Sequence, residues 1–479
     1  MAITLKQLDN NQWMIPKTGH MRVPGIVFSS PKLMETLRED QSLNQVANVA
    51  TLPGIVKYSL AMPDIHWGYG FPIGGVAAFE LDEGIVSPGG VGYDINCGCR
   101  LMTTSLHAEA VRPEIRNLVS TLFKNIPTGV GSRGPIKLSK AEESKVALQG
   151  AAWAVKQGFG KQEDLAKTED YGALEGADPK VLSERAVQRG LDQLGTLGSG
   201  NHFLEIQVLD RIYDPLLARD FRLFEGQITV LIHSGSRGFG HQICDDFLKE
   251  MNKGLSNLSF HLPDRQLACD RITSDLGRRY LAAMACAANY AWANRQVLMS
   301  LTEQTIMDAL LISPKELGME LLYDVCHNIA KKEIHKVNGQ EVVLCVHRKG
   351  ATRSLPPGHP KLPSIYRSTG QPVLIPGDMG TASYVLAGAP GAMESSFGSC
   401  CHGAGRVLSR TQAMKRAKGR AINRELEDQG IFVQSRGKKT LKEEIPEAYK
   451  DVSQVVEVVH KAGLAKKVAR LRPLGVIKG

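Results

Sequence analysis

The sequence lacks several features that mark whole classes of protein. No stretch of its 479 residues approaches the ~18 consecutive apolar residues of a membrane-spanning helix, so we expect no membrane partner. The first residues, Met1 to Lys6, show no basic-then-apolar secretory leader, and nine cysteines in so long a chain do not form a disulfide framework. We therefore expect a cytoplasmic protein with reduced cysteines. Those that lie among apolar neighbours are predicted to be core residues: Cys244, Cys269, Cys286 and Cys345.

The chain does contain material for a large core and for many close turns. Hydrophobic residues make up 43% of it, and its 48 glycines cluster in short loops between apolar runs. Such loops are typical of an enzyme whose backbone approaches a ligand closely. The net charge of +9 gives slight support for a polyanionic partner, and one basic cluster directly follows a Cys-Cys-His loop: Lys415, Arg416, Lys418 and Arg420.

The alternation of apolar runs, glycine turns and helical patterns predicts an α/β (mixed α+β) fold. Strands are predicted at 228–233, 341–347 and 372–375, and helices at 184–194 (with Ser183 as N-cap), 267–299 and 406–420. The polar and acidic stretch 161–178 predicts an exposed insertion at about 155–180. With no long linker and no internal repeat, residues 1–479 are expected to form one large domain.

Five residues have side chains that are common metal ligands. Asp94 and Cys97 are three apart in a loop after a glycine turn, and His202, His233 and His327 each lie at the end of an apolar run. Together they would suffice for two open metal sites that share the Cys97 sulfur, and the hard carboxylate favours Mn²⁺ or Mg²⁺. The spacing alone leaves the alternative open that the cysteine and the histidines are satisfied core residues.

His402 lies in a tight glycine loop, between Cys401 and Gly403, directly before the helical pattern predicted at 406–420. Free N–H groups at a helix start favour phosphate, and a neutral imidazole there can attack phosphorus and carry a phosphoryl group. As a sixth metal ligand it would instead complete the set above. Of these two roles for His402, we favour that of the nucleophile.

Several other residues could recognise a nucleotide. Phe203 could stack on a base, Asn201, Glu205 and Asp378 could bind its polar groups, and the apolar 475–479 segment could dock Lys478 at a ligand. A turn aspartate and a frayed terminus are the alternatives for the last two.

Taken together, these segments resemble the RtcB family of RNA-splicing ligases. The resemblance spans residues 62–405, with Lys478 as a further match, and rests on these blocks: Met62-Pro-Asp-Ile-His-Trp-Gly-Tyr-Gly-Phe-Pro-Ile-Gly-Gly75, Pro88-Gly-Gly-Val-Gly-Tyr-Asp-Ile-Asn-Cys-Gly-Cys-Arg100, Leu197-Gly-Ser-Gly-Asn-His-Phe-Leu-Glu205, His233-Ser-Gly-Ser-Arg-Gly238, His327-Asn328, Pro376-Gly-Asp-Met379 and His402-Gly-Ala-Gly405.

The resemblance implies a GTP- and Mn²⁺-dependent ligase with a deep metal- and nucleotide-binding cleft. Such an enzyme joins RNA 3′-phosphate or 2′,3′-cyclic phosphate ends to 5′-hydroxyl ends in tRNA splicing and RNA repair. Its partners would be RNA (tRNA exon halves and broken RNA ends), GTP and, in some members, the activating protein archease. By position, Asp94, Cys97 and His202 would hold one Mn²⁺, and Cys97, His233 and His327 the second.

The resemblance also implies a covalent step and a nucleotide site. His402 would attack the GTP α-phosphate to give a histidine-GMP intermediate, and GMP would pass to the RNA end. The implied GTP/GMP site consists of Asn201, His202, Phe203, Leu204, Glu205, His327, Asn328, Pro376, Gly377, Asp378, Met379, Ser383, His402, Gly403, Ala404, Gly405 and Lys478.

Four basic residues next to these loops are candidates for holding the RNA end phosphates: Arg189, Arg237, Lys349 and Arg410. Surface solvation is the alternative for each of them. For the whole chain, the alternatives are a metal-dependent phosphoesterase that needs no covalent nucleotide, and a non-catalytic RNA-binding protein.

Overall fold

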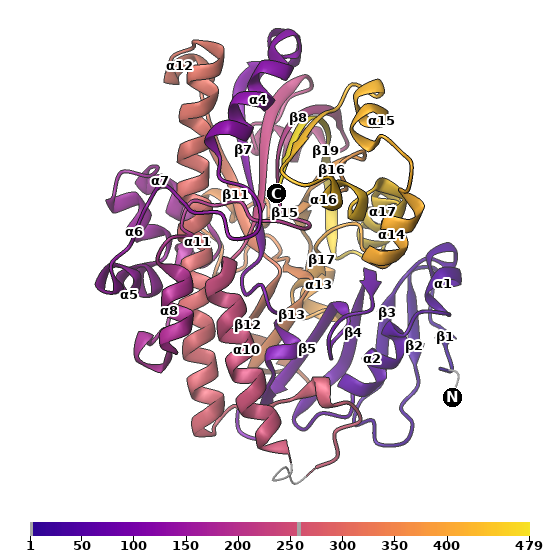
Figure 1. The fold of residues 1–479 in the computed structure, drawn as a ribbon. Helices are drawn as coiled ribbons and strands as arrows, with labels where there is room; N and C mark the ends of the chain where they lie inside the picture. Colours follow the sequence, from indigo (N-terminus) through magenta and orange to yellow (C-terminus); the bar gives the residue numbers. More distant parts are fainter. Residues whose placement is uncertain (1–2, 256–259) are drawn as a thin grey trace.

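The computed structural model describes residues 3–255 and 260–479. Two large, mainly antiparallel sheets form its centre, and helices cover them on both sides (Figure 1). Apolar side chains of both sheets meet in a common core that includes Leu60 and Val346 from one sheet and Val373 and Leu386 from the other. The mixed α/β class predicted from the sequence is confirmed.

The first sheet has seven strands and contains most of the N-terminal hundred residues. Its order is β1 (Lys6–Gln7), β2 (Gln12–Ile15), β3 (Gly25–Phe28), β4 (Ile55–His66), β5 (Ile73–Glu80), β13 (Gln340–Lys349) and β12 (Asn328–Val337). The helices α1 (Pro31–Leu37) and α2 (Ser42–Val49) lie between β3 and β4 in the chain, and α2 packs on β4. The sequence patterns did not predict these two helices.

The second sheet has eight strands and brings distant parts of the chain together. Its order is β11 (Glu320–Cys326), β7 (Gly98–His107), β9 (Gln227–Ser234), β8 (Phe203–Ile212), β19 (Ala465–Lys478), β16 (Ser383–Gly388) and β15 (Pro372–Ile375), and β18 (Phe432–Ser435) pairs with β19 in parallel. The predicted docking of the 475–479 segment is confirmed for Gly475 to Lys478, which lie in the interior strand β19. Two small sheets pair β6 (Ile85–Val86) with β10 (Asp270–Arg271) and β14 (Ala351–Arg353) with β17 (Ser399–Cys401).

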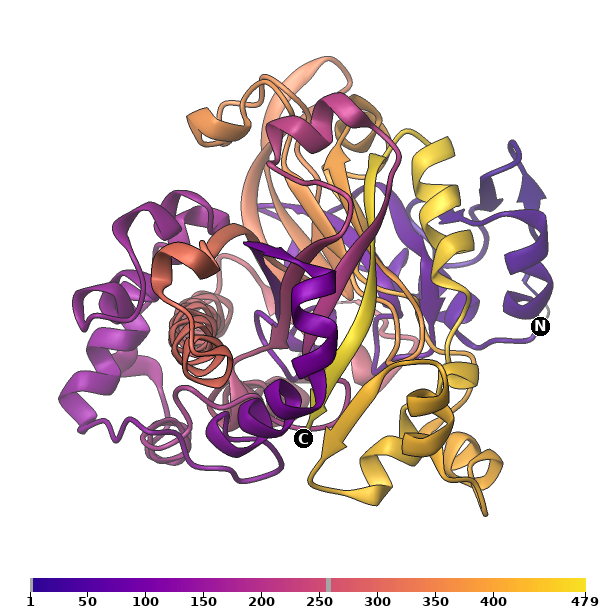
Figure 2. The ribbon, with the colours of Figure 1, turned by 90° about the horizontal axis from the view of Figure 1, so that it is seen from above.

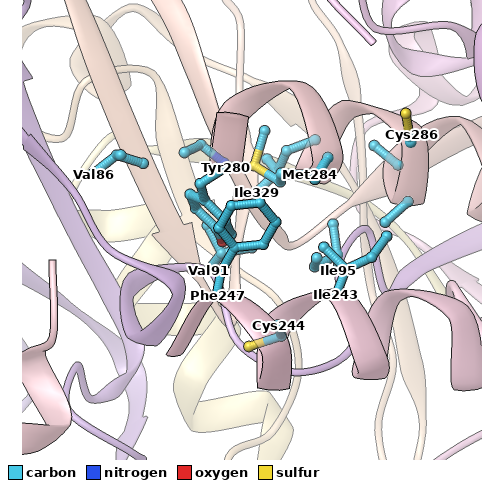
Figure 3. Packing of buried hydrophobic residues seen from close by; sticks show 14 of the residues in the cluster. Val86, Val91, Ile95, Ile243, Cys244, Phe247, Tyr280, Met284, Cys286 and Ile329 are labelled. Atoms are coloured by element: carbon cyan, nitrogen blue, oxygen red, sulfur yellow. Dashed lines mark hydrogen bonds between the residues drawn. The ribbon is translucent and has the colours of Figure 1, made fainter. Parts of the chain in front are cut away.

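A layer of helices covers one flank of the sheets. The 36-residue helix α11 (Asp275–Leu310) packs along α10 (Arg237–Lys253), and Figure 1 shows the two side by side. Seen from above, a group of short helices lies on the outer side of α11 (Figure 2): α5 (Lys140–Gln149), α6 (Ala151–Lys156), α7 (Gln162–Ala166) and α8 (Glu184–Gly190). The core between α10 and α11 contains Phe247, Tyr280 and Met284, with Val91 and Ile95 from the loop that precedes β7 (Figure 3).

Other helices cover the remaining faces. The helix α4 (Ile115–Asn125) packs on β18 and β19. The C-terminal region adds α14 (Arg410–Arg416), α15 (Ile422–Asp428), α16 (Lys438–Glu443) and α17 (Val452–Lys461), which lie away from α11 in Figure 2. Short helices complete the chain: α3 (Ala108–Val111), α9 (Pro215–Asp220), α12 (Pro314–Leu317) and α13 (Pro390–Ser395). None of the helices in residues 3–255 and 260–479 has the length and apolar character needed to span a bilayer.

Some predicted boundaries are confirmed and others are wrong. The strand at 372–375 is β15, and Ser183 caps α8 by accepting from the Ala186 N–H. The helix predicted at 267–299 begins instead at Asp275, after the N-cap Ser274, and continues to Leu310. All nine cysteines are buried and free, as expected.

The predicted exposed insertion at about 155–180 is only partly exposed. Residues 156–158 and 161–163 face solvent, but Asp164 and Glu169 are 5% and 1% exposed. Glu169 pairs with Lys331 at 2.6 Å, and Asp170 pairs with Arg353 at 2.7 Å. Part of the acidic composition of this segment therefore belongs to ion pairs with buried Lys331 and Arg353, which a composition pattern does not distinguish from a solvated surface.

Candidate functional site

The five predicted metal ligands come together at one end of the eight-stranded sheet. Cys97 immediately precedes β7, His202 immediately precedes β8, His233 lies in β9, and His327 follows β11. The order β11-β7-β9-β8 makes these strands neighbours, and the register pairs Gly98 with both Ser234 and Cys326. Sheet pairing, which the sequence spacing does not reveal, thus gathers the ligands.

The ligand atoms form two groups that share one sulfur. The Cys97 Sγ lies 3.3 Å from the His202 Nε2 and 3.2 Å from the His233 Nε2. His233 and His327 face each other with their Nε2 atoms 3.3 Å apart, and an Asp94 oxygen lies 2.8 Å from the His202 Nε2. Within the groups Asp94–Cys97–His202 and Cys97–His233–His327, all ligand atoms lie within 4.8 Å of one another.

The electrostatics of these groups fit divalent cations. Burial holds the pKa of His233 and of His327 well below its ordinary value, so both rings are neutral and can offer a lone pair. Burial and the Asp94 carboxylate raise the pKa of the Cys97 thiol, so holding it as a thiolate requires added positive charge. Burial opposes ionisation of Asp94, but His202 and Arg237 outweigh it and keep the pKa of this carboxyl well below its usual range.

One buried arginine connects the segments that carry the ligands. Arg295, in α11, donates from Nη1 to the carbonyl oxygens of Asn96 (2.7 Å) and Ser234 (3.0 Å), the neighbours of Cys97 and His233. It also pairs with both oxygens of Asp324 in β11, at 2.8 Å each. Arg100 holds the same carboxylate at 2.8 Å, so two buried guanidinium groups share the one negative charge of Asp324.

The loop after β9 orients the first ligand group. The Asp94 Oδ1 accepts from the Ser236 N–H at 3.0 Å, and a Cβ at residue 235 would lie 2.3 Å from this carboxylate, so only glycine fits there. The Arg237 Nη1 lies 3.1 Å from the His202 Nδ1, which leaves the His202 Nε2 for the ligand group. Arg237, predicted from the sequence to hold RNA phosphate, thus contacts a ligand histidine.

His402 forms a tight pair with a carboxylate that the sequence patterns did not single out. Its Nδ1 lies 2.6 Å from the Asp64 Oδ2, and the same oxygen accepts from the backbone N–H groups of His402 (2.9 Å) and Gly403 (3.2 Å). Burial would raise the pKa of Asp64, but His402 and Lys450 lower it further than burial raises it. With Nδ1 engaged in this way, Nε2 is the ring nitrogen that remains for chemistry.

The helix predicted at 406–420 is shorter than predicted. His402 directly follows β17, and α14 spans Arg410–Arg416, with the N-cap Ser409 accepting from the Gln412 N–H at 3.2 Å. Arg406 lies outside the helix, where its backbone bridges to Tyr449 and its side chain pairs with Glu444 at 3.0 Å. The N–H groups around His402 therefore bind Asp64 and do not form the end of a helix dipole.

A cavity of about 180 Å³, the Lys478 cavity, opens on one side of His402. Among the residues predicted for the nucleotide, those that line it are Asn201, Phe203, Pro376, Gly377, Asp378, Met379, His402, Gly403, Ala404, Gly405 and Lys478. The Lys478 ammonium is buried 5.8 Å from the centre of the Phe203 ring and 3.9 Å from the Glu444 Oε2. The sequence patterns did not single out Arg406, Glu444 and Tyr449, which also line this cavity.

Glu205 and Ser383 lie behind the wall of this cavity. The Glu205 Oε2 accepts from Gln207 (2.8 Å), whose amide also donates to the Ser383 Oγ at 3.0 Å. The Glu205 Oε1 is buried without a partner among the described residues, and burial raises the pKa of this carboxyl to about 8. Leu204 points to the opposite face of β8 and packs in an apolar cluster.

A second cavity of about 350 Å³, the Tyr93 cavity, opens on the other side of His402. Asn201, His402 and Arg410 line both cavities. The Tyr93 cavity is further lined by Asp94, Cys97, His327 and Asn328, and by Tyr69 and Tyr93. His402 therefore lines both cavities, and its ring lies next to the candidate metal ligand His327, with ring centroids 4.8 Å apart.

The four phosphate candidates lie in different surroundings. Arg410 is exposed and lines both cavities, and Lys349 lines the Tyr93 cavity. Lys349 donates to the carbonyl oxygens of Tyr69 and Phe71, and burial lowers its pKa to about 7. Arg189 is exposed and donates to Gln242 at 3.1 Å, and the linings of the two cavities do not include it.

Comparison with known proteins gives one consistent result. The sequence profile of the family described as "tRNA-splicing ligase RtcB" matches residues 45–479. A tRNA-splicing ligase RtcB from Thermococcus kodakarensis is 52% identical over 478 residues, which cover 100% of this chain and 99% of the relative. One from Archaeoglobus fulgidus is 52% identical with 99% of both chains covered, and an RNA-splicing ligase RtcB from Mycobacterium tuberculosis is 53% identical over 91% of this chain and 100% of its own.

Proposed function

Because this chain belongs to the RtcB family and is an RNA ligase, we propose that it joins RNA 3′-phosphate or 2′,3′-cyclic phosphate ends to 5′-hydroxyl ends with GTP as cosubstrate. We further propose two bound Mn²⁺ ions, a covalent histidine-GMP intermediate and a cytoplasmic role in tRNA splicing and RNA repair. The observation that carries this proposal is the His402–Asp64 pair, whose histidine lines the Lys478 cavity and lies next to the candidate metal ligand His327.

The first step is guanylylation of His402. The His402 Nδ1–H group donates a hydrogen bond to the Asp64 carboxylate, so the lone pair of the neutral ring lies on Nε2. Nε2 attacks the α-phosphorus of GTP, a P–N bond forms, the bond between the α-phosphorus and the bridging oxygen breaks, and pyrophosphate leaves. The developing positive charge on the ring is stabilised by the Asp64 carboxylate at 2.6 Å.

The Lys478 cavity is the proposed guanylate site. Phe203 offers an aromatic face for the base, and Asp378, 6% exposed, offers a carboxylate for the purine N–H groups. The unpartnered Glu205 oxygen behind the wall is a second acceptor for such a donor. Lys478 and Arg406 supply positive charge beside the His402 loop, where the ribose-phosphate part must lie.

The ligand groups fit two divalent cations, with Asp94, Cys97 and His202 holding one and Cys97, His233 and His327 the other. Bound there, the cations would neutralise the triphosphate and stabilise the pyrophosphate leaving group. The chain's own part is to keep His233 and His327 neutral and to hold the loop of Cys97 rigid through Arg295.

The later steps pass GMP to the RNA and remove it again. An oxygen of the RNA 3′-phosphate attacks the phosphorus on His402, a P–O bond forms and the P–N bond breaks, which restores the neutral ring. The 5′-hydroxyl oxygen then attacks the activated 3′-phosphate, a phosphodiester forms and GMP leaves. A 2′,3′-cyclic phosphate end must first be opened by water to give the 3′-phosphate.

An RNA ligation assay tests the proposal. Two short RNAs, one ending in 3′-phosphate and one beginning with 5′-hydroxyl, are incubated with the protein, Mn²⁺ and either GTP or ATP, with and without archease. We expect the native protein to give a ligated product with GTP and none with ATP. We expect His402→Ala to give no ligated product with either nucleotide. Hydrolysis of the 3′-phosphate without ligation in the presence of archease would instead favour the metal-dependent phosphoesterase.

A further inference from the structure

Two aromatic residues of the Tyr93 cavity are not used by the proposed chemistry. Tyr69 and Tyr93 both line the cavity, and their ring centroids are 5.9 Å apart at an angle of 71°. Tyr93 also contacts His241, with centroids 4.9 Å apart at 33°. Tyr69 and Tyr93 are only half-buried and His241 is exposed, so the three rings form a row that their own chain does not cover.

These rings are held in place by the surrounding backbone. Tyr93 lies next to Gly92, whose φ of +102° favours glycine and whose missing side chain leaves that side of the cavity open toward Asn328 and Lys349. The buried Lys349 ammonium donates to the Tyr69 carbonyl oxygen and fixes the loop from the other side. Leu248 and Cys244 of α10 also line the cavity. Partly exposed aromatic rings that line a cavity are the usual platform for stacked nucleobases.

The position of the cavity selects which nucleobase this would be. His402 lines the Tyr93 cavity and also the Lys478 cavity, which is the proposed guanylate site. The RNA 3′-phosphate must reach the phosphorus carried by His402, so the nucleoside attached to that phosphate has to lie within one nucleotide of this ring. A cavity of about 350 Å³ that is lined by His402 and by both tyrosines provides that space.

We propose that Tyr93, with Tyr69 beside it, stacks on the terminal nucleobase of the RNA 3′-phosphate end and thereby positions that phosphate next to His402. This inference rests on the proposed function. Because every base has a π-face, the site would favour a terminal base over none, with little preference among the four bases.

The test is equilibrium binding of a fluorescent single-stranded RNA with a 3′-phosphate, measured without GTP. A matched RNA lacks only the base of its last nucleotide. For the native protein, loss of that base is expected to weaken binding by about 5- to 150-fold, the range of one base–aromatic stack. Tyr93→Ala is expected to weaken binding of the complete RNA by a similar factor and to bind both RNAs almost equally.

Two control variants isolate the ring. Tyr93→Phe keeps the ring and is expected to discriminate between the two RNAs as the native protein does. Tyr171→Ala removes another aromatic side chain, which is 56% exposed and lines neither cavity. It should leave the affinities for both RNAs unchanged.

Equal affinity of the native protein for the two RNAs would overturn the inference. This comparison uses only the native protein, so it does not depend on the folding of any variant. It is also overturned if the losses from Tyr93→Ala and from the missing base simply add, since the two would then not interact. The binding assay contains no GTP, so its result does not depend on guanylylation of His402. A protein that never forms a GMP adduct would refute the proposed function, and the binding assay would still test the stacking.

Discussion

Replacing Asp64 by asparagine should nearly abolish transfer of GMP to His402 while leaving the shape of the site intact. The Asp64 Oδ2 accepts three N–H groups, from the His402 ring at 2.6 Å and from the backbone of His402 and Gly403 at 2.9 and 3.2 Å. Asparagine has the same size, and its amide oxygen can keep the two backbone bonds. It lacks the negative charge, and its NH₂ group can donate to Nδ1, which would move the ring proton to the attacking nitrogen Nε2.

The expected size of the loss follows from that exchange. In serine proteases, the same carboxylate-to-amide change beside a catalytic histidine lowers the rate about 10⁴-fold through the wrong tautomer. We expect a 10³- to 10⁴-fold slower guanylylation by Asp64→Asn, which corresponds to about 4 to 5.5 kcal/mol of activation free energy. The rate is measured with saturating GTP and Mn²⁺. Samples are quenched at successive times, and the fraction of protein with the added mass of GMP is determined.

Glu143→Gln is the matched control, because it neutralises another fully buried carboxylate in α5, outside the linings of both cavities. Its guanylylation rate should equal that of the native protein. A folded Asp64→Asn variant that is guanylylated within about tenfold of the native rate would refute the role assigned to this carboxylate.

Three further predictions follow from buried charges. Arg295→Met leaves Asp324 paired with Arg100 but removes the donor to the buried carbonyl oxygens of Asn96 and Ser234, so the free energy of unfolding in denaturant should fall by about 1–3 kcal/mol; an unchanged value would contradict the bracing role. Because the pKa of Glu205 is about 8 in the free protein, a guanine N–H that binds its ionised form should displace a proton. GTP affinity should therefore rise up to tenfold per unit between about pH 6 and 8, and calorimetry should find no such rise in Glu205→Gln. Burial raises the pKa of Glu143 to about 7, so the native state binds the proton more tightly and loses stability as pH rises from about 4.5 to 7. Glu143→Gln should thus stabilise the protein above pH 7, by up to about 3 kcal/mol, and have little effect near pH 4; equal unfolding free energies at pH 8 would contradict this.

Some strands of the second sheet could be predicted because they are continuous apolar runs. The run at 228–233 and the run that ends at Cys326 are β9 and β11, and the histidine at the end of each is a candidate ligand. A local pattern cannot show that β7 lies between these two strands, since pairing order depends on contacts between residues far apart in the chain. The ligands were therefore identifiable as residue types, but the sharing of Cys97 was not derivable from their spacing.

Asp64 shows why other parts of the site could not be predicted. It lies within the strand β4, next to apolar residues, and its partner His402 is 338 positions away. The available signal was the charge itself, because a carboxylate inside an apolar strand needs a partner in the folded protein. Near His402, the basic composition of 406–420 matched a helix, but the Arg406–Glu444 pair and the Ser409 cap delay the helix to Arg410. Contacts with distant residues decided both cases.

The central claim is that His402 carries GMP, and intact-mass spectrometry tests it most directly. The native protein and His402→Ala are incubated with GTP and Mn²⁺, with archease in a parallel sample, and their masses are compared before and after acid treatment. The account predicts one GMP adduct on the native protein, lost in acid because the P–N bond is labile, and no adduct on the variant. An adduct of the same mass on His402→Ala, or none on a native protein that ligates RNA, would contradict it.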